Sequence, residues 1–168
     1  MPKKNPYLSF SGEEHLPKED RKAIEKAFND VARAAMLPDA LLSVTFVDDD
    51  TMKALNKQWR RKNKTTDVLS FSAVEAGEMP GPHAVLGDIV ISAEVAKRQA
   101  AEAGHTLVEE VAVLFAHGIL HVLGLDHERS PEEARMQAEC EMGILDAAGF
   151  NPELTLVGRT QFYAGKKN

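Results

Sequence analysis

The stretch HGILHVLGLDH, from His117 to His127, decides how this chain must fold, because it requires a helix followed at once by a turn. Its first two histidines, His117 and His121, stand four residues apart and therefore lie on one face of a helix. Gly124 suits the left-handed conformation that commonly ends a helix. The chain can then turn back and bring His127 over the pair, so that three imidazoles surround one metal ion.

The predicted metal ligands are His117, His121 and His127, with a fourth position left for an exchangeable ligand. Three neutral ligands and an open position are typical of catalytic rather than structural zinc. Imidazoles also suit copper, nickel or iron; we expect zinc, Zn(2+), one ion per chain. Asp126 has two possible roles beside the third ligand: its carboxylate orients an imidazole by accepting the second N–H, or it stabilises the turn.

The helix that carries the histidine pair is predicted to run from Leu107 to Leu123 and to be buried. Thr106 and Glu109 form the capping-box pattern at its start. Apolar residues occupy most of its sides, namely Val108, Val111, Ala112, Leu114, Phe115, Ile119 and Val122. A helix packed on several sides holds its ligands in fixed positions.

Strand and helix patterns intermix along the rest of the chain. Alternating apolar and β-branched residues predict strands at 7–10, 41–47, 67–71 and 85–91. Apolar faces and capping residues predict helices at 17–36, 92–103 and 130–148, and a short helix after residues 48–50 with the apolar stripe Met52, Leu55 and Trp59. Residues 74–84 are predicted to form an exposed loop. The expected fold class is α/β (α+β): a small mixed β-sheet packed against about five helices, with the buried metal helix at its centre.

Composition favours a single domain over residues 1–168, which we interpret as a metal-dependent hydrolase domain. A chain of 168 residues buries enough surface to fold without disulfides. Cys140 is the only cysteine, which is typical of a reducing compartment. No apolar run resembles a signal peptide or a membrane span. We therefore expect a cytoplasmic location and no membrane partner.

Residues 51–66, here called the basic segment, hold six lysines and arginines and no acid, in a chain of net charge −6. A local positive charge on an acidic chain can direct an anionic ligand to one place. A solvated helix face and turn explains the same charges equally well. The six residues are Lys53, Lys57, Arg60, Arg61, Lys62 and Lys64.

The histidine pattern resembles that of zinc peptidases with the motif H-E-x-x-H-x-x-G-x-x-H. Gly118 replaces the glutamate that serves those enzymes as general base, so a peptidase is the weaker interpretation. Gly118 either lets another segment approach closely or only serves packing.

Phosphodiester cleavage suits these residues better, because a metal ion and a guanidinium stabilise a negatively charged transition state. Arginine matches the geometry of phosphate, and the basic segment supplies Arg60 and Arg61. Trp59 beside them has two possible roles, stacking on a base or anchoring its helix in the core. The helical spacing favours the core.

Three blocks of the sequence resemble the YbeY endoribonuclease family. The first is LNKQWRRKNKTTDVLSF (55–71), in which Asn56, Arg60, Thr66 and Asp67 occupy characteristic positions. The second is LGDIVIS (86–92), and the third is HGILHVLGLDH with the following EEARMQAECEMGIL. The blocks occur in the family's order and span nearly the whole chain.

This resemblance implies a single-strand-specific, metal-dependent endoribonuclease in rRNA processing, notably 3′ end maturation of small-subunit rRNA, and in ribosome quality control. It implies zinc held by the three histidines, Arg60 as the functional arginine, and RNA rather than DNA as substrate. It also suggests the ribosomal small subunit and an assembly GTPase as partners. Further RNA contacts are expected at Lys57, Arg61, Lys62 and Lys64.

One alternative stays open beside the peptidase: a ribosome-assembly binding factor in which the zinc is structural. That site would need a fourth protein ligand, and Cys140 is the candidate. A cysteine on a long helix is more often a small buried apolar residue.

Overall fold

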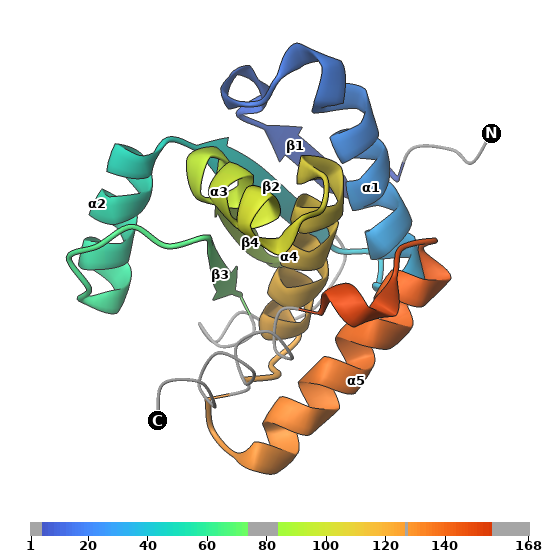
Figure 1. The fold of residues 1–168 in the computed structure, drawn as a ribbon. Coiled ribbons are helices and arrows are strands. Elements are labelled where there is room, and N and C mark those ends of the chain that lie inside the picture. Colours follow the sequence, from blue (N-terminus) through green and yellow to red (C-terminus); the bar gives the residue numbers. More distant parts are fainter. Residues whose placement is uncertain (1–4, 74–83, 127, 156–168) are drawn as a thin grey trace.

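The computed structural model describes residues 5–73, 84–126 and 128–155. In these ranges the strands form one sheet with the order β1-β2-β4-β3, and helices pack around it (Figure 1). The strands are β1 (Leu8–Ser11), β2 (Leu41–Val47), β3 (Val68–Ser72) and β4 (Val85–Ser92). β1, β2 and β4 run parallel and β3 pairs antiparallel with β4, so the sheet is mixed, as predicted.

Five α-helices and three short 3-10 helices accompany this sheet in the described ranges. The α-helices are α1 (Arg21–Ala34), α2 (Asp49–Arg60), α3 (Ala93–Ala103), α4 (Leu107–Val122) and α5 (Pro131–Ala147). The 3-10 helices are η1 (Glu13–His15), η2 (Lys18–Asp20) and η3 (Pro152–Leu154). The predicted helix 17–36 thus divides into η2 and α1, and the predicted loop falls outside the described residues except for Ala84.

Side chains that cap the helices fix where they start. The Thr106 hydroxyl accepts the backbone N–H of Glu109, and the Glu109 carboxylate accepts that of Thr106, which forms the predicted capping box of α4. Ser92 at the start of α3 and Ser130 at the start of α5 each accept one backbone N–H through the hydroxyl, without a reciprocal bond. These local signals explain why the starts of α3, α4 and α5 could be predicted well.

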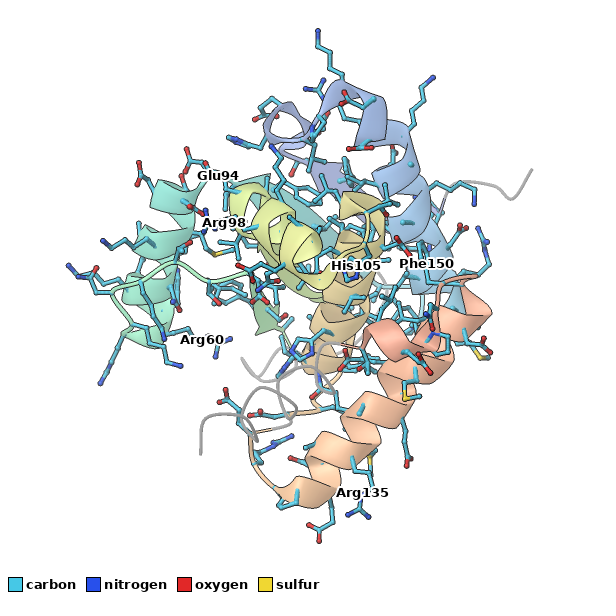
Figure 2. The ribbon with its side chains drawn as sticks, in the orientation of Figure 1. Arg60, Glu94, Arg98, His105, Arg135 and Phe150 are labelled. Atoms are coloured by element: carbon cyan, nitrogen blue, oxygen red, sulfur yellow. The ribbon has the colours of Figure 1, made fainter. Side chains whose placement is uncertain are left out.

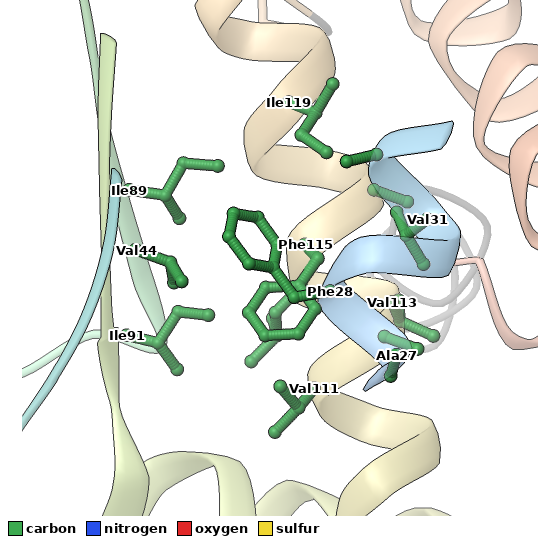
Figure 3. Packing of buried hydrophobic residues seen from close by; sticks show 14 of the residues in the cluster. Ala27, Phe28, Val31, Val44, Ile89, Ile91, Val111, Val113, Phe115 and Ile119 are labelled. Atoms are coloured by element: carbon green, nitrogen blue, oxygen red, sulfur yellow. The ribbon is translucent and has the colours of Figure 1, made fainter. Parts of the chain in front are cut away.

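The core lies between the sheet and α4, with α1 completing it (Figure 3). Phe115 on α4 has its ring centroid 4.8 Å from that of Phe28 on α1 and 6.1 Å from that of Phe46 on β2. Each such fully buried side chain stabilises the fold by about 1.5–3 kcal/mol. From Glu110 to Leu120 every residue of α4 is buried, so the predicted central position of this helix is confirmed.

No single helix among the described residues is both long enough and apolar enough to cross a bilayer, and only α3 and α4 together reach that length, with a bend of 113° between them.

Candidate active site

The two histidines of α4 lie at the end of the helix that faces β3 and α5. Their ring centroids are 4.5 Å apart, and Nε2 of His117 lies 3.0 Å from Nε2 of His121. His117 is 5% exposed, whereas His121 is half-buried. The predicted i,i+4 pair is therefore formed, with both Nε2 atoms directed to one point.

Two buried side chains of α5 contact the other nitrogen of His117. Glu141 Oε2 and Gln137 Nε2 each lie 3.2 Å from His117 Nδ1, and both side chains are fully buried. Glu141 Oε1 also accepts a hydrogen bond of 3.3 Å from the hydroxyl of Thr155. Sequence reasoning missed Gln137 and Glu141; their i,i+4 spacing on α5 was the signal that could have found them.

The carboxylate decides which nitrogen of His117 carries the proton. A hydrogen bond to a charged carboxylate is roughly twice as strong as one to a neutral group, so Nδ1 carries the proton and donates it to Glu141. An amide N–H cannot donate to a protonated Nδ1. Gln137 can therefore hydrogen-bond to His117 only when its amide oxygen, and not its nitrogen, faces the ring. In that orientation Gln137 Oε1, otherwise without a hydrogen-bond partner among the described residues, shares the Nδ1–H of His117 with Glu141.

With Nδ1 protonated, the lone pair of His117 is on Nε2, where it faces His121. Two nitrogen ligands of a tetrahedral zinc ion lie ~3.3 Å apart, given bond lengths of about 2.0–2.1 Å. The 3.0 Å separation observed here is close to that spacing. The donor set and its protonation therefore fit a divalent zinc ion held by His117 and His121.

The turn after α4 has the predicted conformation. Gly124 has φ +102°, and the N–H of Leu125 returns to the carbonyl of Leu120. The carboxylate of Asp126 accepts the N–H of Glu128 at 2.9 Å, which stabilises the turn. His127 lies outside the described residues, and within these no group of three potential ligands forms a metal site.

Gly118 is a packing glycine that brings α4 close to the sheet. A Cβ on Gly118 would lie 3.0 Å from Ile89 Cγ2 and 3.2 Å from Ser70 Oγ. A glutamate at this position would point into β3 and β4 instead of toward the histidines. The close packing of α4 on β3 and β4 at Gly118 therefore leaves no room for the glutamate of the peptidase motif.

Arg60, the last residue of α2, reaches β3 beside the histidine helix. Its Nη2 donates to the carbonyl of Ser70 at 2.7 Å, and its Cζ lies 5.8 Å from the ring centroid of Phe71. The hydroxyl of the same Ser70 packs toward Gly118, next to His117. Figure 2 shows Arg60 directed from α2 toward the body of the molecule. Most of its five N–H donors stay available to an anion.

Buried Asn56 and half-buried Asp67 hold in place the last residues of the basic segment, which follow α2. Asn56, 3% exposed, donates through Nδ2 to the carbonyl of Lys64 at 2.8 Å. Asp67 accepts the N–H of Val68 at 2.8 Å and the amide of Gln99 at 3.2 Å. These contacts give Asn56 and Asp67 a structural role, while the side chains of Lys57, Arg61, Lys62 and Lys64 are exposed.

A second polar network fixes the start of α2. Asp49 accepts hydrogen bonds from Ser92 at 2.8 Å and from Arg98 at 3.1 Å, and Figure 2 shows Arg98 lying between α3 and α2. Burial raises the pKa of Asp49, but the hydrogen bonds from Ser92 and Arg98 and the charge of Arg98 together lower it below its ordinary value of 3.8. The helix that carries Arg60 is thus tied to the end of β4.

Two expectations about single residues have different outcomes. The expectation that Trp59 anchors α2 in the core is wrong, because its side chain is 59% exposed. Trp59 makes an edge-to-face contact with Phe71 on β3, with ring centroids 5.9 Å apart. Cys140 is half-buried and packs against the apolar core, which favours its role as a small apolar residue.

The fold and this site define an α/β domain with a histidine pair on its buried helix and a basic segment whose Arg60 reaches the neighbouring strand β3. The sequence profile of the family described as "Endoribonuclease YbeY" matches residues 9–149. The chain belongs to the YbeY family.

Relatives with the same description are similar over most of the chain. The Endoribonuclease YbeY of Desulforamulus reducens is 48% identical over 117 residues, 68% of this chain and 76% of the relative. That of Aquifex aeolicus is 47% identical over 122 residues, 73% of this chain and 79% of the relative. The chloroplastic Endoribonuclease YBEY of Arabidopsis thaliana is 50% identical over 109 residues, 65% of this chain but 18% of that longer protein.

A solution structure of a Thermotoga maritima protein has the same fold. Its TM-score is 0.53 at 24% sequence identity, and the match covers 83% of this chain and 89% of that one. This likeness supports the α/β architecture alone.

Proposed function

We propose that this protein is a single-strand-specific, metal-dependent endoribonuclease in rRNA processing, including 3′ end maturation of small-subunit rRNA, and in ribosome quality control. The observation that carries the proposal is the buried contact between His117 Nδ1 and Glu141, which leaves Nε2 of His117 facing Nε2 of His121. Membership of a family described as an endoribonuclease supports RNA as the substrate.

In this proposal His117, His121 and His127 hold one zinc ion. When bound, zinc supplies positive charge to a phosphate oxygen or acidifies a water toward neutral pH. Glu141 and Gln137 keep the imidazole of His117 in the orientation and tautomer that a metal ligand needs. Arg60 then donates to the phosphate from the direction of β3 and offsets its developing charge.

The basic segment holds the flanking RNA strand by charge. Lys57, Arg61, Lys62 and Lys64 have exposed side chains, and the hydrogen bonds of Asn56 and Asp67 keep the backbone of this region in place. Cytoplasmic location, contact with the ribosomal small subunit and an assembly GTPase partner stay predictions beside this proposal.

The proposal is tested by incubating the purified protein with casein and with unstructured single-stranded RNA, each with and without a chelator. We expect cleavage of RNA alone, lost with the chelator and restored by zinc. His121→Ala should lose both the metal and the cleavage; full activity of a verified metal-free sample would exclude a catalytic metal. A thiolate charge-transfer band in a cobalt-substituted sample would instead indicate a closed, structural site that includes Cys140.

A further inference from the structure

Trp59, the only tryptophan of the chain, is a large apolar side chain left on the surface at the end of α2. It is 59% exposed, whereas Met52 of the same predicted stripe is fully buried and Leu55 is half-buried. Neither the core nor the proposed metal site explains this exposure. An exposed aromatic ring in a fixed place is typical of a binding surface.

The indole is held in place by the same residue that contacts Arg60. Phe71 on β3 packs edge-to-face with Trp59, with centroids 5.9 Å apart and planes at 72°. The guanidinium of Arg60 lies 5.8 Å from the centroid of the same Phe71 ring. An edge-to-face pair does not sandwich the indole, and Trp59 stays 59% exposed while one side of the ring system contacts Phe71. A ring ordered in advance loses little conformational entropy on binding.

The positive charge around Trp59 favours an anionic ligand. The basic segment holds no acidic residue, and its exposed cations flank the indole on α2 and on the turn that follows, at Lys57, Arg61, Lys62 and Lys64. Aromatic rings set among exposed cations are the usual means of binding single-stranded nucleic acid, because bases stack on the rings while the cations follow the phosphates. A duplex offers no free base face to such a ring.

We propose that Trp59 forms a base-stacking subsite for an unpaired nucleotide of the RNA. This inference rests on the proposed nuclease function and deepens it. Because Phe71 contacts both Trp59 and Arg60, the stacked base belongs to a nucleotide next to the phosphate that Arg60 contacts. The subsite thus gives a physical reason for a preference for single strands, which phosphate contacts alone do not give.

The single tryptophan makes stacking directly measurable. The zinc-loaded, full-length protein is mixed in a stopped-flow instrument with an unstructured RNA oligonucleotide, and Trp59 emission is recorded before cleavage products appear. Two matched probes carry the same number of phosphates: an oligoribonucleotide with abasic sites and a blunt RNA duplex. We expect saturable quenching with the single strand and little change with either probe. Equal quenching by the abasic strand or by the duplex would overturn the subsite.

Variants then separate stacking from charge, with binding followed by the anisotropy of labelled RNA. Trp59→Ala should weaken binding of the single strand about tenfold and leave the abasic strand unaffected, while Trp59→Tyr keeps most of the affinity. Met136→Ala is the matched control, because Met136 on α5 is 51% exposed and lies outside the basic segment.

If Trp59→Ala binds the single strand as well as wild type does, the subsite is excluded, and the exposed ring serves another contact such as a protein partner. RNA cleavage by the wild-type protein is measured in parallel samples. Quenching without cleavage would overturn the nuclease function and keep the base-stacking site. Cleavage without quenching would keep the nuclease function and overturn the base-stacking site.

Discussion

Nδ1 of His117 on α4 lies 3.2 Å from Oε2 of Glu141 on α5, in a contact from which solvent is excluded. The pair joins two helices that belong to distant parts of the chain, and it fixes both the orientation of the imidazole and the nitrogen that carries its proton. The packing of α4 against α5 therefore sets the direction in which His117 presents Nε2.

Replacement of Glu141 by glutamine should lower zinc affinity about tenfold, since partners of a ligand's second nitrogen typically contribute 10- to 100-fold. The amide keeps the shape of the side chain but removes the charge that holds the proton on Nδ1. Competition with a fluorescent zinc chelator measures the affinity without reference to activity. Glu139→Gln, an exposed change on the same helix, should leave it unaltered; an equal loss in both variants would contradict the positioning role.

Removal of the guanidinium of Arg60 should leave the metal and lower RNA cleavage. In Arg60→Ala the carbonyl of Ser70 accepts a hydrogen bond from water instead. The transition state loses one charged donor, so kcat should fall about a hundredfold. Zinc content by elemental analysis and kcat with labelled RNA check the two halves of this prediction. Arg135→Ala removes the same charge from an exposed position on α5, outside the basic segment, and should retain most activity; cleavage at the wild-type rate in Arg60→Ala would leave Arg60 as a surface charge.

The parts of the fold that could be predicted from the sequence are those set by neighbours along the chain. The capping box of Thr106 and Glu109, the left-handed Gly124 and the i,i+4 spacing of the histidines depend only on nearby residues. Each element therefore formed where its own residues required it, and the central helix followed from its apolar sides.

The parts that could not be predicted depend on which elements meet in space. Glu141 faces His117 only because α5 folds back along α4; the i,i+4 spacing of Gln137 and Glu141 indicates a shared helix face but not which helix that face meets. Trp59 has the spacing of a core residue, but it lies at the end of α2, where its side chain is largely exposed. For Asp126 two roles were predicted, orienting an imidazole or stabilising the turn, and the contact described for it is with the turn.

Introduction of the peptidase glutamate at Gly118 should destabilise the protein without giving it peptidase activity. The new side chain would meet Ile89 and Ser70 and bury a carboxylate in this packed region, at a cost of roughly 3 kcal/mol or more. Urea unfolding followed by circular dichroism measures the loss. Gly143→Glu on the exposed side of α5, where an added Cβ meets nothing within 4 Å, should be neutral or slightly stabilising; equal stability of the two variants would contradict the close packing of α4 on the sheet.

The hydrogen bonds of Asp49 should make the anchoring of α2 sensitive to acid. Its pKa is below the ordinary value of 3.8 in the folded protein, so its stabilising contribution is fully present above pH 3.8 and is lost as the pH falls through the lower, folded value. Asp49→Asn should therefore unfold at a lower temperature than wild type at neutral pH, and the difference in Tm should shrink below pH 3.8. Thermal unfolding over a pH series measures this difference. Asp50→Asn, one residue further along α2, is the matched control. A Tm difference for Asp49→Asn that stays constant down to the acid limit would show that the carboxylate of Asp49 stabilises the fold through its shape and not through its charge.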